Sequence, residues 1–242
     1  MSSWGRMIAG AMRGIVAFAA LAYIGSMVSP AAADEGSVAR GGRLYDKWWT
    51  ENKAVKPADD HPSYPVKGGK NGKETSWRCK ECHGWDYKGK DGVYASGSHA
   101  TGIKGINGAA GKDPAAIIAI LKDAQHGYTE AMLNAADMND LAQFVSKGQF
   151  DMTPFVDAAT KTPKGDVAKG AEYFNTICVG CHGADGKKMK DSPPLGSVAD
   201  NPWEMLHKVS NGQSGEVMPA LRVLDRQIAA DLVAYLQTLP KQ

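Results

Sequence analysis

The four cysteines of this 242-residue chain form two short motifs of the same kind. The first, CKECHG, begins at Cys79, and the second, CVGCHG, begins at Cys178. In each motif two residues separate the cysteines and a histidine follows at once, which gives the matched sets Cys79, Cys82, His83 and Cys178, Cys181, His182. A pattern that occurs twice and uses every cysteine of the chain indicates the same chemistry at two sites.

Cys-x-x-Cys-His is the attachment signature of c-type haem. Its spacing suits that chemistry, because two thiols must reach the two vinyl groups on one edge of a porphyrin while the adjacent imidazole turns beneath the ring to bind iron. The sequence therefore predicts two covalently bound haem c groups. We expect thioether bonds from the four cysteines and axial iron bonds from His83 and His182.

Other uses of the cysteines explain the motifs less well. A redox-active disulfide within each motif would be typical of a thioredoxin-like βαβ unit, and the surrounding sequence lacks that pattern. A zinc site built from all four cysteines would need a much longer separation between the pairs than zinc ribbons have. Neither alternative gives the two histidines a role.

The first 33 residues have the features of a secretory signal peptide. Arg6 and Arg13 precede a short apolar run, and Ala31 and Ala33 fit the small-residue rule for cleavage before Asp34. Without Arg6 and Arg13, the 28 basic residues fall to 26 and equal the 26 acidic ones, so nothing suggests binding to nucleic acid. We expect an exported, periplasmic protein with no membrane span after signal cleavage.

The sequences around the two motifs follow a common plan. A Gly-x-x-Tyr unit precedes each motif, at Gly42–Tyr45 and Gly170–Tyr173. An amphipathic helix with an N-terminal aspartate cap closes each unit, over 137–148 and over 225–239. The first unit also carries an insertion at about 51–77, whose proline, glycine and charged residues predict an ordered loop or small hairpin.

On these residues, the chain resembles a dihaem, two-domain class I cytochrome c over nearly all of residues 37–242. The resemblance implies an all-α fold with two class I cytochrome c domains in tandem, each a small helical bundle around one haem c. It also implies that Gly42–Tyr45 meets Leu141–Phe144 and that Gly170–Tyr173 meets Leu232–Tyr235. The expected order is a signal peptide at 1–33, a first domain at 34–150, a linker at 151–166 and a second domain at 167–242.

Met218 is the expected sixth ligand of the second haem. It precedes Pro219 in a loop between two predicted helices, and a proline stiffens the loop that presents the sulfur. Met-Pro in this loop is similar to the distal loop of the family. The resemblance further implies that a carbonyl of Pro193 or Pro194 accepts the Nδ1 proton of His182.

The sixth ligand of the first haem has two candidates. Pairing Gly127 with Gly212, the glycines that end the preceding helices, places Met132 almost opposite Met218. No proline follows Met132, and His126, at the helix end, is the alternative ligand. The sequence favours Met132 on this alignment, and it does not indicate which carbonyl orients the proximal histidine of this haem.

Two further expectations concern side chains outside the motifs. Four tryptophans of the first unit surround its motif and predict a packed shell around the haem: Trp48, Trp49, Trp77 and Trp85. His207, on a predicted helix of the second unit, is expected at the surface.

The favoured function is a periplasmic electron carrier, not an enzyme, that passes single electrons between other redox proteins as donor and acceptor. A second possibility is an electron-transfer subunit of a larger periplasmic dehydrogenase or oxidase complex, with the insertion at about 51–77 as its docking surface. A third is a dihaem enzyme, such as a peroxidase or a thiosulfate-oxidising enzyme. It would need an open sixth position, for which only the first haem leaves room.

Overall fold

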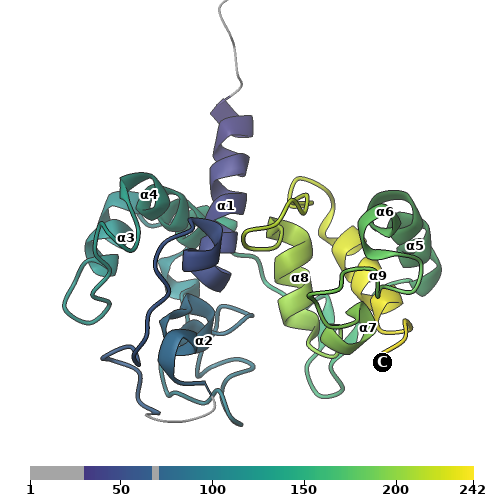
Figure 1. The fold of residues 1–242 in the computed structure, drawn as a ribbon, viewed down its shortest axis with the longest axis horizontal. Helices are drawn as coiled ribbons and strands as arrows, with labels where there is room; N and C mark the ends of the chain where they lie inside the picture. The colour runs from purple at the N-terminus through teal and green to yellow at the C-terminus, as the bar shows by residue number, and fades with distance from the viewer. Residues whose placement is uncertain (1–29, 67–70) are drawn as a thin grey trace, which may run out of the picture.

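The structure is a computed structural model that describes residues 30–66 and 71–242. The described chain is mainly helical, with one short hairpin, and forms two lobes that lie side by side (Figure 1). The all-α prediction is therefore confirmed. Most of the predicted signal peptide, residues 1–29, lies outside the described residues.

The first lobe is built around the contact between its first and last helices. Helix α1 is kinked at Lys47, where the backbone leaves helical geometry (φ −153°, ψ 80°). A π-helical turn at Phe144–Gly148 extends helix α4. Short 3₁₀ helices lie at Lys73–Trp77 and Asn107–Ala109. The helices of this lobe are α1 (Pro30–Glu51), α2 (Cys79–His83), α3 (Pro114–Leu121) and α4 (Ala135–Gln143).

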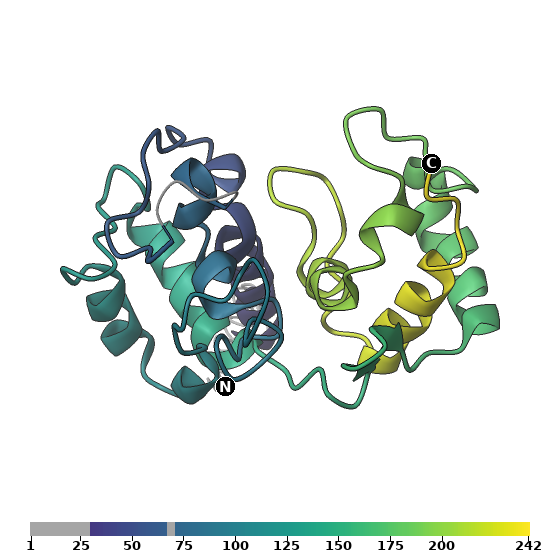
Figure 2. The ribbon, with the colours of Figure 1, turned by 90° about the horizontal axis from the view of Figure 1, so that it is seen from below.

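The second lobe repeats the plan on a smaller scale. Strands β1 (Val156–Asp157) and β2 (Thr162–Pro163) pair antiparallel in the segment between the lobes, which runs along one edge of the molecule (Figure 2). A π-helical turn at Phe174–Cys178 joins the first two helices of the lobe. The helices are α5 (Val167–Tyr173), α6 (Val179–His182), α7 (Leu195–Val198), α8 (Pro202–Asn211) and α9 (Arg226–Leu236).

A glycine lets the first and last helices of each lobe touch. In the first lobe, a Cβ atom on Gly41 would collide with the carbonyl oxygen of Asp140. In the second lobe, a Cβ atom on Gly170 would collide with the carbonyl oxygen of Asp231. Backbones this close pack side chains tightly on either side of the crossing, and any larger residue would push the helices apart.

The predicted contact between first and last helices is present in both lobes, and one residue differs in each. The crossing glycine of the first lobe is Gly41 rather than Gly42, and the aromatic partner of Tyr235 in the second lobe is Phe174 rather than Tyr173. Aromatic rings pair across the crossings at Tyr45–Phe144, with centroids 5.4 Å apart, and at Phe174–Tyr235, 5.3 Å apart. The repeated unit is thus glycine, three residues, aromatic, rather than Gly-x-x-Tyr. Gly42 serves a different contact, because a Cβ atom there would collide with Asn211 of the second lobe.

The closing helices begin as capping chemistry requires. Asp225 caps α9, as predicted, and accepts a hydrogen bond from the amide of Gln227 (2.9 Å). Helix α4 starts earlier than predicted, because Asn134 is its cap and Asp137 occupies the third helical position. The Asn134 side chain accepts a hydrogen bond from the Asp137 amide, and the Asp137 side chain accepts one from the Asn134 amide. This reciprocal pair satisfies backbone donors at the start of the helix that would otherwise have only water as a partner.

The two lobes meet through a buried histidine. The ring of His207, on α8, is fully buried, so the surface position expected for it is wrong. The Tyr87 hydroxyl donates to its Nδ1, and its Nε2–H donates to the Gly42 carbonyl, both at 2.9 Å. A neutral imidazole with both nitrogens satisfied can be buried at little cost, whereas an unpaired one could not.

Polar contacts surround this histidine at the interface between the lobes. Arg43 donates to the Asn211 carbonyl (3.0 Å), and Arg222 pairs with Glu35 (2.5 Å). The Ser214 hydroxyl donates to the Arg43 carbonyl (2.8 Å). Helices α1 and α8 are therefore held together by apolar packing and by specific hydrogen bonds, which fixes the orientation of one lobe on the other.

Acid should weaken this interface through His207. Burial lowers the pKa of His207 to about 4, below the ordinary value of 6.5. The neutral ring therefore contributes its full stability above pH 6.5, and the contribution is lost as pH falls toward 4, by roughly 3 kcal/mol in total. Chemical unfolding of the haem-loaded protein between pH 7 and 4 measures this loss.

His207→Gln is the matched control, because glutamine can still hydrogen bond but does not titrate. The wild type should lose more stability than this variant over the same pH range. Parallel stability curves would show that protonation of His207 does not govern the interface.

Candidate haem-binding sites

The first motif occupies helix α2, a single turn that presents both thiols and the imidazole of His83. Cys79 and Cys82 are half-buried and form no disulfide. Burial raises the pKa of the Cys79 thiol to about 11 and that of Cys82 to about 12, so both thiols are neutral near pH 7. They are placed to react with a group held in the apolar interior of the lobe.

Buried charges anchor this helix. Arg78 pairs with Asp46 of α1, and Lys80 donates to Glu81 at 2.6 Å between the two cysteines. Glu81 also contacts Nδ1 of His99 at 2.7 Å. Because each buried charge has a partner, α2 can lie against the core without an uncompensated ion.

The carbonyl oxygen of Lys104 orients His83. It lies 2.7 Å from Nδ1 of the ring, which leaves Nε2 for a metal. Lys104 is held in place by an isolated antiparallel bridge with Gly89. Burial also lowers the pKa of His83 to about 4, so the ring is in the neutral form that binds iron.

The second motif lies where a π-helical turn leads into α6. Cys178 is half-buried and Cys181 is exposed, and neither forms a disulfide. Burial lowers the pKa of His182, so this ring is also neutral near pH 7. Within the described part of the chain, His182 makes no hydrogen bond to Pro193 or Pro194, so this implied contact is not found.

The tryptophans around the first motif pack in more than one part of the first lobe. Trp48 and Trp49 are buried and meet edge to face, 5.4 Å apart. Trp85 faces the other lobe, since its ring lies 5.2 Å from that of His207 and Lys208 lies over it at 5.8 Å. Trp85 thus belongs to the contact between the lobes as well as to the surroundings of the motif.

The insertion contacts the loop that follows α3. Nε2 of His61 lies 2.9 Å from the carbonyl oxygen of His126, and the Ser63 hydroxyl donates to the Gln125 carbonyl at 2.7 Å. The His61 ring meets Trp77 with centroids 4.3 Å apart. The described residues 52–66 and 71–77 form a loop with one 3₁₀ helix and no strand, so of the two predicted forms they adopt the loop and not the hairpin.

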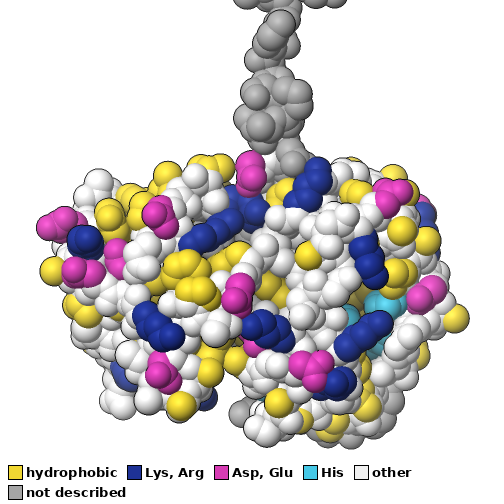
Figure 3. Space-filling view, turned by 180° about the vertical axis from the view of Figure 1, so that it is seen from behind, with side chains coloured by type: hydrophobic (Ala, Val, Ile, Leu, Met, Phe, Trp, Pro, Cys, Tyr) yellow, Lys and Arg dark blue, Asp and Glu magenta, His cyan; other side chains and the backbone are white. Residues whose placement is uncertain are grey.

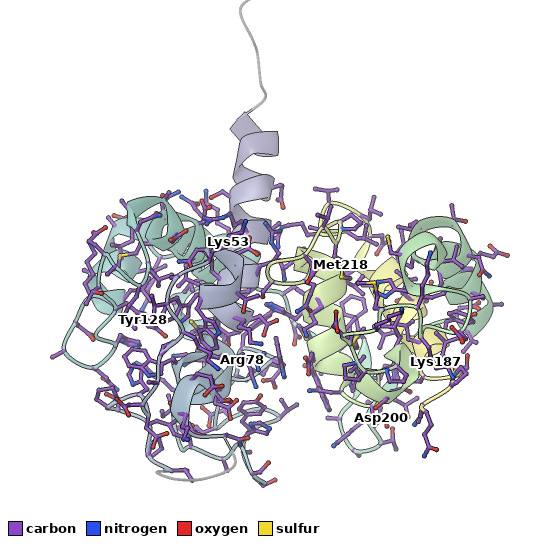
Figure 4. The ribbon with its side chains drawn as sticks, in the orientation of Figure 1. Lys53, Arg78, Tyr128, Lys187, Asp200 and Met218 are labelled. Atoms are coloured by element: carbon purple, nitrogen blue, oxygen red, sulfur yellow. The ribbon has the colours of Figure 1, made fainter. Side chains whose placement is uncertain are left out.

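The candidate sixth ligands lie in the loops before the closing helices. The ring of His126 is 6.3 Å from that of His83, with 21° between the ring planes. Met132 is partly buried against the apolar core, and its carbonyl accepts a hydrogen bond from Asn52 at 2.8 Å. Met218 is likewise partly buried, in the loop between α8 and α9 (Figure 4). Histidine side chains reach the surface of the first lobe on the face shown in Figure 3.

These residues fit a haem rather than the other groups considered. All four cysteines are free, and the described residues contain no group of three or more His, Cys, Asp or Glu side chains arranged to hold a metal ion. A porphyrin supplies four of the six iron ligands itself, so each motif needs to provide only one imidazole. Its partly buried thiols and oriented histidine match that requirement.

Family models match each lobe separately. The model "Cytochrome c" matches residues 69–149, and the model "Cytochrome C oxidase, cbb3-type, subunit III" matches residues 165–236. The first range contains the motif at Cys79 and the second contains the motif at Cys178. Each match therefore includes one complete Cys-x-x-Cys-His sequence.

Individual proteins are similar over more limited regions. The cbb3-type cytochrome c oxidase subunit CcoP of Azospirillum brasilense is 31% identical over 87 residues, which are 31% of this chain and 28% of that protein. A solved thiosulfate dehydrogenase (TsdBA) from Marichromatium purpuratum aligns with 83% of this chain and 45% of its own, with a TM-score of 0.27 and 18% identity. Together, the two family matches show that this chain is a dihaem class I cytochrome c, with two cytochrome c domains and two haem c groups.

Proposed function

We propose that this dihaem cytochrome is a periplasmic electron carrier and not an enzyme. In this proposal a signal peptide at 1–33 directs export, residues 34–150 and 167–242 form the two domains, and residues 151–166 link them. Within residues 30–66 and 71–242, no helix has the length and apolar character needed to cross a bilayer. The two cytochrome c domains, each with its own haem attachment motif, support a carrier.

The observation that carries this proposal is the matched construction of the two sites. Each lobe presents a Cys-x-x-Cys-His turn on one element and a candidate sixth ligand on a loop of the same lobe. When bound, the haem supplies one-electron chemistry at iron. The chain would supply the two remaining ligands of each iron and an apolar environment, and a bound sixth ligand would leave no open position for a substrate.

A second candidate is an electron-transfer subunit of a larger oxidase or dehydrogenase. The similarity of the second domain to a cbb3-type oxidase subunit family favours it, although the chain spans only 28% of the curated relative that it matches. Native gel separation of extracts from the source cells distinguishes the two. A free carrier migrates at its own mass, and a subunit migrates with an oxidase or dehydrogenase activity.

Covalent attachment can be tested one motif at a time. Replacing Cys178 and Cys181 with alanine should leave one haem per chain after acid–organic extraction, because both thioether bonds of that site are lost. Replacing Cys79 and Cys82 should remove the other haem. Haem that is fully extracted from the unmodified protein would contradict the proposal.

Met218→His should keep the second haem six-coordinate and lower its reduction potential, because imidazole stabilises ferric iron more than a thioether does. A spectroelectrochemical titration measures the shift. Met189→His is the control, since Met189 is 42% exposed and its replacement should leave both potentials unchanged. An unchanged potential in Met218→His would show that Met218 only packs in the core.

A further inference from the structure

We infer that the first haem has two histidine ligands, His83 and His126, and that the insertion at about 51–77 holds His126 in place. The inference rests on the proposed function, since it requires a haem attached to Cys79 and Cys82. It replaces Met132, the ligand favoured by alignment of the two domains, with the alternative from the same loop.

The separation of the two rings is the first observation that supports this ligand pair. An iron–nitrogen bond of about 2 Å and a distance of about 1.1 Å from nitrogen to ring centre, on each side of the metal, place two bound imidazoles about 6 Å apart. The ring centroids of His83 and His126 are 6.3 Å apart, and their planes differ by 21°. The measured centroid distance agrees with the spacing of two imidazoles on opposite sides of one iron.

The second observation is that both rings keep the same nitrogen available. Nδ1 of His83 lies 2.7 Å from the Lys104 carbonyl, and Nδ1 of His126 lies 3.1 Å from a carboxylate oxygen of Asp123. With Nδ1 engaged in each ring, Nε2 is left to bind metal. A carboxylate or carbonyl partner of this kind fixes the ring and increases the basicity of a metal-bound histidine.

The third observation concerns the insertion, which has no counterpart in the second domain. Its His61 and Ser63 bond to the carbonyls of His126 and Gln125, the loop residues at the candidate ligand. Its Trp77 packs on the ring of Tyr128, with centroids 5.9 Å apart, and the Trp77 carbonyl accepts a hydrogen bond from the Tyr128 hydroxyl at 2.8 Å. The insertion therefore contacts this loop on both sides of the candidate ligand.

The second domain uses the corresponding position differently. Asn211 aligns with His126, but it is buried at the interface, where its side chain bonds to Arg222 and to the carbonyl of His207. That position is thus not available as a ligand, and Met218 in the following loop remains. The two haems should accordingly differ, with a bis-histidine iron of lower potential in the first domain and a histidine–methionine iron of higher potential in the second.

The unmodified protein provides a test without any variant. A methionine bound to ferric haem gives a weak far-red sulfur-to-iron band. The oxidised protein carries two haems per chain, and we expect the band intensity of only one methionine-ligated haem per chain. Intensity for two methionine-ligated haems would overturn the inference.

Variants identify the ligand directly. In the reduced protein, His126→Ala should allow one carbon monoxide per chain to bind, while Met132→Ala, the matched control, should bind none. In the oxidised protein, Met132→Ala should keep the full far-red band. If Met132→Ala binds carbon monoxide and His126→Ala does not, Met132 is the ligand. Counting the haems per chain distinguishes a wrong ligand assignment from a failure of the proposed function. If the proposed function fails, the first motif carries no covalently bound haem.

The role of the insertion is tested with His61→Phe. This variant keeps an aromatic ring against Trp77 and removes the hydrogen bond to the His126 carbonyl. We expect two haems per chain and carbon monoxide binding that is slower or less complete than in His126→Ala. A first haem that stays fully closed would show that the insertion does not hold His126.

Discussion

Haem c imposes the constraint on which the rest of this structure depends: one flat group must be bound by two thiols at one edge, by an imidazole on one face and by a sixth ligand on the other face. A single helical turn provides the first three, as α2 and the turn into α6 show. The sixth must come from a distant loop. Glycine at the crossing of first and last helices closes the chain around the site, at Gly41 and Gly170.

The same need for fixed geometry extends to the pair of domains. Electron transfer between two haems depends on their separation, which a flexible linker alone would not maintain. Helices α1 and α8 instead form an interface in which His207 bonds to both Tyr87 and Gly42. Asp46, near Arg78 and Lys208, adds charge pairing at the edge of this contact. The interface therefore makes the dihaem chain behave as one unit.

Features that depend on residues close together in the chain could be predicted from the sequence. Features that depend on contacts with backbone far away in the chain could not. The two motifs, the all-α fold and the cap at Asp225 follow from residue types a few positions apart. The different roles of Gly41 and Gly42 could not be predicted, because these adjacent glycines contact different lobes. His207 was wrongly expected at the surface, because α8 packs against both lobes. The Lys104 carbonyl was missed because a backbone acceptor cannot be recognised from residue types in the sequence.

An optical redox titration of the purified protein, followed by addition of carbon monoxide to the reduced form, tests the central claim that the chain carries two unlike haems with both irons closed. The account predicts two one-electron transitions at separate potentials and no spectral change with carbon monoxide. A single potential for both haems, or binding of carbon monoxide to the native reduced protein, would contradict it.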